Sequence, residues 1–247
     1  MLRAMIEVLE LDKEYEGTPA VQGLSFSVQP GEVLGLVGPN GAGKTTTMRC
    51  ITGILQPTRG TVRVAGCDIV RQPVDAKQHL AFIPDDPQLF DYLTIREHMQ
   101  FFGRVFNVGD VAEHSATLLE QLELTGKEDM LPGQLSRRMK QKVAIACGLV
   151  HRPKAVLFDE PLTGLDPVAI RRIKQIIRQL AADGSAVIIS SHLLGLVEEI
   201  ATSLLLLQNG KKVLHGSIAD VRASAPDLKD GTLESIFMRA TGYEEAP

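Results

Sequence analysis

The fold of this chain is decided by the stretch Gly38-Pro39-Asn40-Gly41-Ala42-Gly43-Lys44-Thr45. It lies between an apolar run, Val33 to Val37, and a helix-forming run from Thr46 to Thr52. A glycine-rich loop between a strand and a helix turns its backbone N–H groups toward a phosphate, and the helix dipole favours the same anion. In this pattern the lysine reaches the β- and γ-phosphates, and the hydroxyl after it can ligate Mg²⁺. The stretch therefore predicts an α/β fold that binds a nucleoside triphosphate.

A second apolar run lies far downstream, at residues 155–159, and ends in two adjacent carboxylates. A run this apolar is typical of a strand inside a parallel sheet that is covered on both faces. At the end of such a strand, Asp159 would hold the Mg²⁺ shell, and Glu160 would polarise the attacking water as a general base. An isolated Asp-Glu pair in this place would instead indicate a solvated loop start, and the phosphate loop upstream favours the functional interpretation.

Two further motifs follow that strand. One is Pro161-Leu162-Thr163-Gly164-Leu165-Asp166-Pro167, and the other is a third apolar run, Ala186 to Ser190, leading to Ser191-His192. With the phosphate loop and Leu157-Phe158-Asp159-Glu160-Pro161, in this order and at this separation, the chain resembles the ATP-binding subunit of an ABC transporter. It is most similar to the export-type bacterial group with a single cassette. The resemblance extends from about Met5 to about Met238, and the combination of motifs is highly specific.

The resemblance implies ATP and Mg²⁺ as cofactors and a role for each matching residue. The catalytic residues would be Glu160, His192 and Lys44, with His192 contacting the γ-phosphate and orienting the water. The metal ligands would be Thr45, Asp85 and Asp159. The nucleotide would be bound by Tyr15, which would stack on adenine, and by Gly38, Pro39, Asn40, Gly41, Ala42, Gly43, Lys44, Thr45 and Thr46, with Ser136, Arg137, Arg138 and Asp166 at a subunit interface. Tyr15 as an ordinary loop residue and His192 as a structural residue remain alternatives.

The signature segment departs from the family pattern. Members usually carry Leu-Ser-Gly-Gly, whereas this chain has Leu135-Ser136-Arg137-Arg138. Ser136 remains a suitable N-cap, and helical dihedrals accept arginine, so the expected loss is the close approach that glycine allows. Two guanidinium groups near a triphosphate would be attractive, like arginine fingers supplied by the other subunit. The hypothesis is that these arginines tune or weaken the composite site; two exposed arginines with no function are the alternative.

Asp85 is the second departure, because the family commonly places a glutamine there. It stands in Phe82-Ile83-Pro84-Asp85-Asp86-Pro87. A carboxylate is a hard oxygen ligand and can serve a metal. Export-type members often have an acidic residue in this place, so the resemblance implies that the change marks a subgroup. A plain Pro-Asp-Asp-Pro turn is the alternative.

Composition indicates one globular intracellular subunit. The 247 residues are 44% hydrophobic, which is enough for a large buried core. No apolar run approaches the length of a membrane span, and charges interrupt the first ten residues, so neither a membrane span nor a signal peptide is expected. The net charge of −4 argues against a nucleic-acid partner. Cys50, Cys67 and Cys147 are expected to be reduced and structural.

We expect one α/β domain of the P-loop NTPase type. It would combine a core with a mostly parallel sheet, an N-terminal antiparallel β subdomain and an inserted helical subdomain that carries the signature. Helical periodicity over Thr94 to Asn107, Val111 to Leu124 and Ser136 to Val150 marks the insertion. The predicted division is a core of residues 1–84 and 152–215, a helical subdomain of residues 85–151 and a C-terminal tail of residues 216–247.

Aromatic residues crowd the start of the predicted helical subdomain. We expect Leu89, Phe90 and Tyr92 to dock a cytoplasmic helix of a membrane subunit, as the resemblance implies. Phe101, Phe102 and Phe106 are spaced along a helix and are expected in the core. In the tail, Leu233, Ile236 and Phe237 are expected to pack on the core from one helical face.

The functional prediction is a motor subunit that hydrolyses ATP and powers a separate membrane permease through ATP-dependent head-to-tail dimerisation, as a homodimer or a heterodimer. It would be cytoplasmic and peripheral at the inner face of the membrane. A regulatory nucleotide-binding module with weak hydrolysis, because of the altered signature, is the alternative. An ABC-type ATPase acting on DNA or ribosomes fits poorly, since such relatives usually bring long coiled coils or two fused cassettes.

Overall fold

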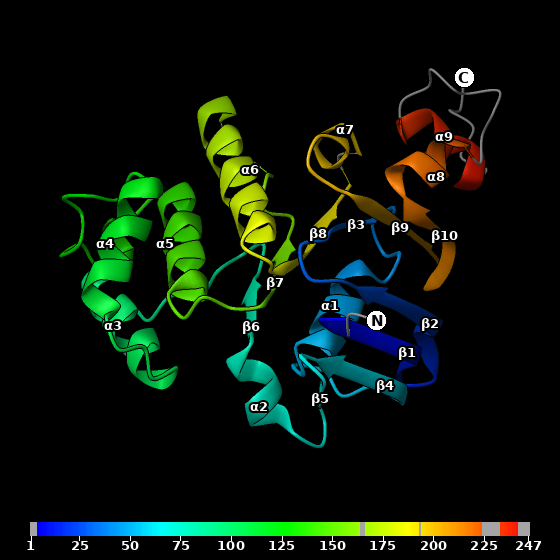
Figure 1. Cartoon of the computed structure of the whole chain (residues 1–247), viewed down its shortest axis with the longest axis horizontal. Coiled ribbons are helices and arrows are strands. Elements are labelled where there is room, and N and C mark those ends of the chain that lie inside the picture. Colours follow the sequence, from blue (N-terminus) through cyan, green and yellow to red (C-terminus); the bar gives the residue numbers. More distant parts are fainter. Residues whose placement is uncertain (1–3, 164–165, 193, 224–232, 242–247) are drawn as a thin grey trace.

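The computed structural model describes residues 4–163, 166–192, 194–223 and 233–241. It is a mixed α/β fold built on two sheets, as the sequence predicts (Figure 1). Helices α3, α4 and α5 gather to one side of the larger sheet, and the smaller sheet lies toward the other side. The parts of the tail at residues 224–232 and 242–247, and Gly164 and Leu165 of the motif at residues 161–167, lie outside the described residues.

The larger sheet has six strands in the order β10-β9-β3-β8-β7-β6. All its neighbouring pairs run parallel except β9 and β10, which form an antiparallel hairpin. The three central strands are buried at every residue, as their continuous apolar runs predict. The strands are β3 Val33–Val37, β6 Leu80–Ile83, β7 Ala155–Asp159, β8 Ala186–Ser191, β9 Ser203–Gln208 and β10 Lys211–Ser217.

Alternate residues of the central strands face two different cores. Leu34 and Leu36 of β3 pack toward helix α1 (Lys44–Ile51) and the smaller sheet. On the other face, Val33 packs with side chains of α5 (Arg137–Leu149) and α6 (Pro167–Ala182). Because both faces of the sheet are covered, its only accessible parts near β3 are the strand ends, and this is where a site can form.

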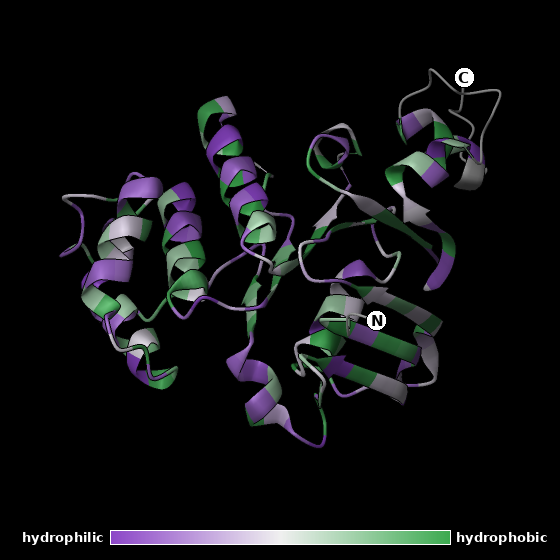
Figure 2. Cartoon of the chain, viewed as in Figure 1, coloured by the Kyte–Doolittle hydropathy of each residue, from purple (hydrophilic) through white to green (hydrophobic). Residues whose placement is uncertain are grey.

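The smaller sheet is antiparallel, with the order β2-β1-β4-β5. It confirms the expected N-terminal β subdomain, although the strands are longer than the sequence pattern indicates. Figure 2 shows green and pale or purple bands alternating along β1, β2 and β4, as expected for strands with one buried face. The strands are β1 Ile6–Tyr15, β2 Thr18–Val28, β4 Arg59–Val64 and β5 Cys67–Asp68, and the short helix α2 Pro73–Gln78 follows.

The three expected helices of the middle segment are present as α3 (Ile95–Val105), α4 (Val111–Gln121) and α5. Helix α3 begins at a capping box, in which the Thr94 hydroxyl accepts from the Glu97 N–H and the Glu97 carboxylate accepts from the Thr94 N–H. Helix α5 begins after Ser136, whose hydroxyl accepts from the Met139 N–H at 3.3 Å. Local capping chemistry therefore fixes where these helices start.

The expectation of core packing is wrong for Phe101, whose side chain is 41% exposed. Its position on α3 faces away from the core, and its ring makes edge contacts with Phe90 and Phe102 instead. Phe102 packs on the core beneath α3, and Phe106 stacks on His151. Helical spacing alone could not separate the buried aromatic from its exposed neighbour.

Three further helices lie in the last part of the described chain: α7 Leu194–Glu198, which precedes β9, and α8 Ile218–Ala223 and α9 Leu233–Thr241, which follow β10. Leu233 and Ile236 are buried, and Phe237 packs against the same cluster. The expected packing of the last helix on the core is confirmed.

His151 supports a prediction about stability. Its ring stacks on Phe106 with centroids 3.7 Å apart and planes 7° apart, and burial lowers its pKa to about 4. An unfolded histidine titrates near pH 6.5, so between these values the unfolded chain binds a proton that the folded chain does not. The contribution of neutral, buried His151 to the free energy of unfolding is therefore complete above about pH 6.5 and is lost as the pH falls toward 4.

We expect His151→Phe to keep the stacking and remove this dependence. In urea unfolding, the free energy of unfolding of the parent should fall by about 1–2 kcal/mol more than that of the variant between about pH 7 and pH 4.5. If the free energies of unfolding of both proteins fell equally with pH, the effect could not come from His151.

Candidate active site

The phosphate loop joins the carboxyl end of β3 to the first turn of α1. Gly43 stands at the N-cap position with φ 99°, a left-handed conformation that favours glycine. A side chain at Gly38 would meet the Leu207 carbonyl oxygen at 2.3 Å, and one at Gly43 would meet the Ala20 carbonyl oxygen at 2.6 Å. These two glycines therefore allow neighbouring backbone to close around the loop, which leaves its N–H groups as the inner lining for an anion.

Lys44 is the first residue of α1 and is almost fully buried. Its ammonium donates to the carbonyl oxygens of Gly38 and Pro39 at 2.7 and 3.2 Å, so the side chain folds back across the loop. Burial lowers the pKa of Lys44, and the nearby negative charges of Glu160 and Asp159 oppose that shift. The lysine therefore lies between the phosphate loop and the two carboxylates that the sequence predicts to be functional.

Asp159 and Thr45 meet at the end of β7. The Thr45 hydroxyl donates to Asp159 Oδ1 at 3.3 Å, and the Ser190 hydroxyl donates to the same oxygen at 2.5 Å. A hydroxyl and a carboxylate are hard oxygen ligands of the kind that Mg²⁺ accepts alongside phosphates and water. Across the described ranges no cluster of three or more His, Cys, Asp or Glu side chains could hold a metal alone, so a Mg²⁺ here would share these two ligands with a nucleotide.

Ser190 is a site residue that the sequence reading missed. Its hydroxyl also accepts from the Glu160 N–H at 3.0 Å, so one buried side chain orients both carboxylate-bearing residues. The signal was available, because Ser190 is the polar end of an otherwise apolar strand and lies beside Asp159 in the parallel register.

Glu160 and His192 lie together just beyond the ends of β7 and β8. His192 Nδ1 is 3.0 Å from Glu160 Oε2, and the Thr163 hydroxyl donates to the same oxygen at 3.2 Å. Glu160 has φ 49°, a left-handed conformation that is costly for a residue with a side chain. The hydrogen bond from the Glu160 N–H to the Ser190 hydroxyl helps to hold this backbone in place.

Comparison with known proteins agrees with this geometry. Residues 21–163 match the family model described as ABC transporter. This chain belongs to the ABC transporter family. The ABC-type transporter ATP-binding protein EcsA of Bacillus subtilis (strain 168) is 29% identical over 240 residues, which are 96% of this chain and 97% of EcsA. The Nod factor export ATP-binding protein I of Paraburkholderia xenovorans (strain LB400) is 37% identical over 226 residues, or 91% and 74% of the two chains.

A solved structure described as the ATP binding subunit of an ABC transporter superposes with a TM-score of 0.91 at 30% identity, covering 96% of this chain and 99% of that one. The chain is thus an ATP-binding subunit of an ABC transporter and an ATPase. None of the helices in the described part of this ABC subunit is long and apolar enough to cross a membrane.

Tyr15 of the ABC subunit ends β1 and is partly exposed. The Lys13 ammonium lies 5.2 Å from the centre of its ring and also donates to the Gln56 carbonyl oxygen at 3.0 Å. A cation over one face of an aromatic ring fixes the ring and leaves the other face available. Stacking of adenine on Tyr15 stays a prediction.

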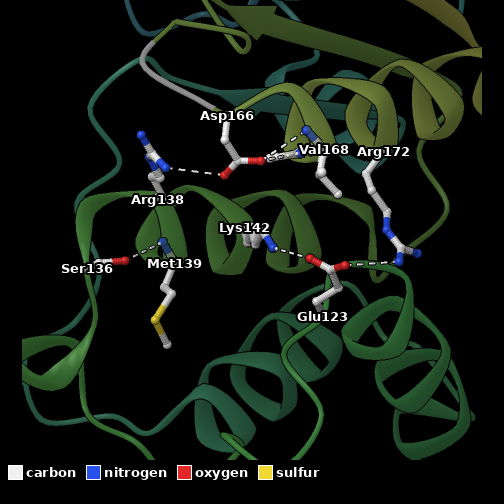
Figure 3. Close-up of polar contacts among 9 residues, drawn as sticks. Glu123, Ser136, Arg138, Met139, Lys142, Asp166, Val168 and Arg172 are labelled. Atoms are coloured by element: carbon white, nitrogen blue, oxygen red, sulfur yellow. Dashed lines mark hydrogen bonds and ion pairs between the residues drawn. The ribbon is translucent and has the colours of Figure 1, made fainter.

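The signature residues lie at the start of α5, and Figure 3 shows how Arg138 and Ser136 are engaged there. Arg138 Nη1 is 3.2 Å from Asp166 Oδ2, and Arg137 Nη2 is 3.6 Å from Asp85 Oδ1. The structure therefore brings Asp85 and Asp166, predicted as a metal ligand and an interface residue, into ion pairs with the two arginines of the same chain.

Ser190 provides a test of the metal ligand set. We expect Ser190→Ala to raise the Mg²⁺ concentration needed for half-maximal ATPase activity by about 10- to 100-fold, because residues that orient metal ligands typically have effects of this size. Ser185→Ala is the matched control, since this buried hydroxyl lies at the opposite end of the same strand and bonds the Pro153 carbonyl oxygen. Equal Mg²⁺ requirements in both variants would refute the role given to Ser190.

Proposed function

We propose that this ABC subunit is the motor of a transporter, in which ATP binding closes a head-to-tail dimer and hydrolysis reopens it. Its partner would be a separate membrane permease, which would hold the subunit at the cytoplasmic face of the membrane. The observation that carries the proposal is the contact of Glu160 with His192 at the same sheet edge as Lys44 and Asp159. A binding module without turnover would have no use for this pair.

In the proposed reaction the loop N–H groups and Lys44 bind the β- and γ-phosphates, and Glu160 accepts a proton from the attacking water. Mg²⁺ bound by Thr45 and Asp159 would supply neutralising charge on the phosphates. Thr163 and His192 hold the Glu160 carboxylate from two directions, so its position does not depend on the nucleotide. Prepositioning of this kind lowers the cost of reaching the reactive geometry.

The contact with Glu160 also restricts what His192 can do. A ring that donates from Nδ1 to the carboxylate presents Nε2 as an acceptor when the ring is neutral and as a donor only when it is protonated. Donation to a γ-phosphate from Nε2 therefore requires the imidazolium form.

The dimer is proposed because Ser136 caps the start of α5, as the signature of the family requires. In the head-to-tail arrangement this helix start would meet the γ-phosphate bound by the other subunit, as a homodimer or a heterodimer. The γ-phosphate would then bind the closed state better than the open one, and its loss would remove that differential affinity.

The regulatory module with weak hydrolysis is not favoured. The altered signature leaves the Ser136 cap and the helix intact, and the hydrolytic side chains are assembled. The relative named a Nod factor export ATP-binding protein supports an export motor as the closer analogy, without identifying what this transporter carries.

Loop aromatics are the proposed contact with the permease. Tyr92 is 92% exposed and Phe90 is 50% exposed, with the Phe90 ring stacked beside His98. Leu89 is partly buried against the core and supports the loop rather than offering a free surface. Exposed aromatic side chains on a supported loop are suited to anchoring a partner helix.

We expect Tyr92→Ala to reduce co-sedimentation of the subunit with membranes of the source cells by about tenfold or more, since central aromatic anchors often contribute over 1 kcal/mol. Val74→Ala is the control, because Val74 is exposed on α2, away from this loop. If the Tyr92 variant sedimented with membranes as the parent does, the loop would not be part of the contact with the permease.

The decisive test of the motor is Glu160→Gln. We expect ATP binding to persist while turnover falls by about 10²- to 10⁴-fold, because the amide cannot accept the proton. Size-exclusion chromatography with ATP and Mg²⁺ should then show a dimer, and Lys44→Ala should remain monomeric. Near-normal turnover would sink the base assignment, and a persistent monomer with ATP bound would rule out the homodimer.

A further inference from the structure

Helix α5 begins with an electrostatic conflict. Arg137 and Arg138 are its first two residues, and the first turn contains no acidic residue. The partial positive charge of a helix N-terminus disfavours cations there. Two adjacent arginines in this place therefore need compensation from outside the helix.

Each arginine has a carboxylate partner from a different part of the chain. Arg137 pairs with Asp85, which follows β6 of the large sheet, at 3.6 Å. Arg138 pairs with Asp166, at the N-cap of α6, at 3.2 Å. The two acids belong to different segments outside α5, one just after β6 and the other at the start of α6, so the two pairs connect the signature to both.

Asp166 is well suited to this connection because its two oxygens have separate partners. Oδ1 accepts from the Val168 and Ala169 N–H groups at 3.1 and 2.9 Å, which caps α6, and Oδ2 faces Arg138 (Figure 3). These backbone hydrogen bonds, more than Arg138, lower the pKa of Asp166 and keep it ionised. One carboxylate thus joins the starts of α5 and α6.

A second contact between these helices lies one turn further along α5. Glu123 accepts from Lys142 of α5 and from Arg172 of α6, each at 3.0 Å, as Figure 3 also shows. This cluster does not involve the signature residues. It gives the helical segment a second attachment that remains when the pairs at the helix start are broken.

We propose that Arg137 and Arg138 are positioning residues that hold the start of α5 against the core of the same chain, through Asp85 and Asp166. The next step rests on the proposed dimer. When the partner's triphosphate approaches, the same guanidinium groups face an anion with more negative charge than the two carboxylates. Closure then exchanges two carboxylate pairs within one chain for contacts with the partner's nucleotide. Because all four side chains are solvent-accessible, the hold is modest and sensitive to salt.

The first experiment measures how firmly the two arginines keep the helical segment in place relative to the large sheet. It uses the nucleotide-free chain, so it does not depend on dimerisation. Spin labels are placed at Glu113→Cys on α4 and Lys211→Cys on β10, both exposed, in a Cys67→Ser background that removes the least buried cysteine. We expect Arg137→Gln with Arg138→Gln to broaden or shift the distance distribution at low salt. The parent should approach the same distribution at about 1 M salt, where the Debye length is about 3 Å.

Arg96→Gln is the matched control. It breaks an exposed pair of similar geometry, Arg96 with Asp129 at 3.0 Å, that lies within the helical segment and does not reach the core. A distribution unchanged by the signature variants, or changed equally by Arg96→Gln, would overturn the proposal.

Asp166→Asn isolates the ion pair from the helix cap, since asparagine is also a good N-cap. In the Glu160→Gln background, we expect it to lower the ATP concentration for half-maximal dimer by about two- to fivefold, the range for an exposed pair. It should add nothing when Arg138→Gln is already present, as a double-mutant cycle requires. If Asp166→Asn leaves the ATP concentration for half-maximal dimer unchanged or raises it, the proposed exchange of the Arg138–Asp166 pair for the partner's nucleotide is wrong.

The two experiments separate two kinds of failure. If the Glu160→Gln parent forms no dimer, the proposed motor fails, and the label distances still decide whether the arginines hold α5. If the parent dimerises but the distances ignore the arginines, the motor stands and the inference fails.

Discussion

The parallel register of β3, β8 and β7 is the constraint on which the site depends. It places Val37 opposite Ser191 and Asp159 opposite Ser190, so three strands end at one edge of the sheet. Thr45 of the phosphate loop precedes Asp159 by 114 residues, and Glu160 precedes His192 by 32, yet all of them lie at one of these ends. A slip of one residue would reverse the faces of an entire strand, and burial on both sides prevents it.

At that edge, Asp159 shows how one polar atom organises its neighbours. Its Oδ1 accepts from Ser190 and from Thr45, which come from two other core elements. In a partly buried site such hydrogen bonds are strong, and leaving the carboxylate without them would be costly. Ser190 also accepts from the Glu160 N–H, so the positions of the proposed metal ligand and of the proposed base depend on the same hydroxyl.

The sequence predicts the elements at this edge because their signals are local. Continuous apolar runs gave the buried strands, the glycine pattern gave the loop, and Ser136 gave the start of α5. Ser190 was missed because its role depends on which strand lies beside it, and strand order is not a local property. Phe101 was misassigned for a related reason, since helical spacing does not say which of two adjacent faces meets the core. The partners of Arg137 and Arg138 could not be read from spacing either, because Asp85 and Asp166 are distant in sequence.

The signature of this chain has arginine at two positions where the family pattern has glycine, and the two residues act in different physical ways. Glycine acts at the start of a helix by what it lacks, since it lets another backbone or a phosphate come close. Arginine acts through charge and over a longer distance, but a cation at a helix N-terminus is unfavourable unless a nearby anion compensates it. Asp85 and Asp166 provide this compensation within the chain. In the dimer that we propose, this segment would exchange two carboxylates of its own chain for the partner's nucleotide, and the balance between the two would depend on ionic strength as well as on ATP.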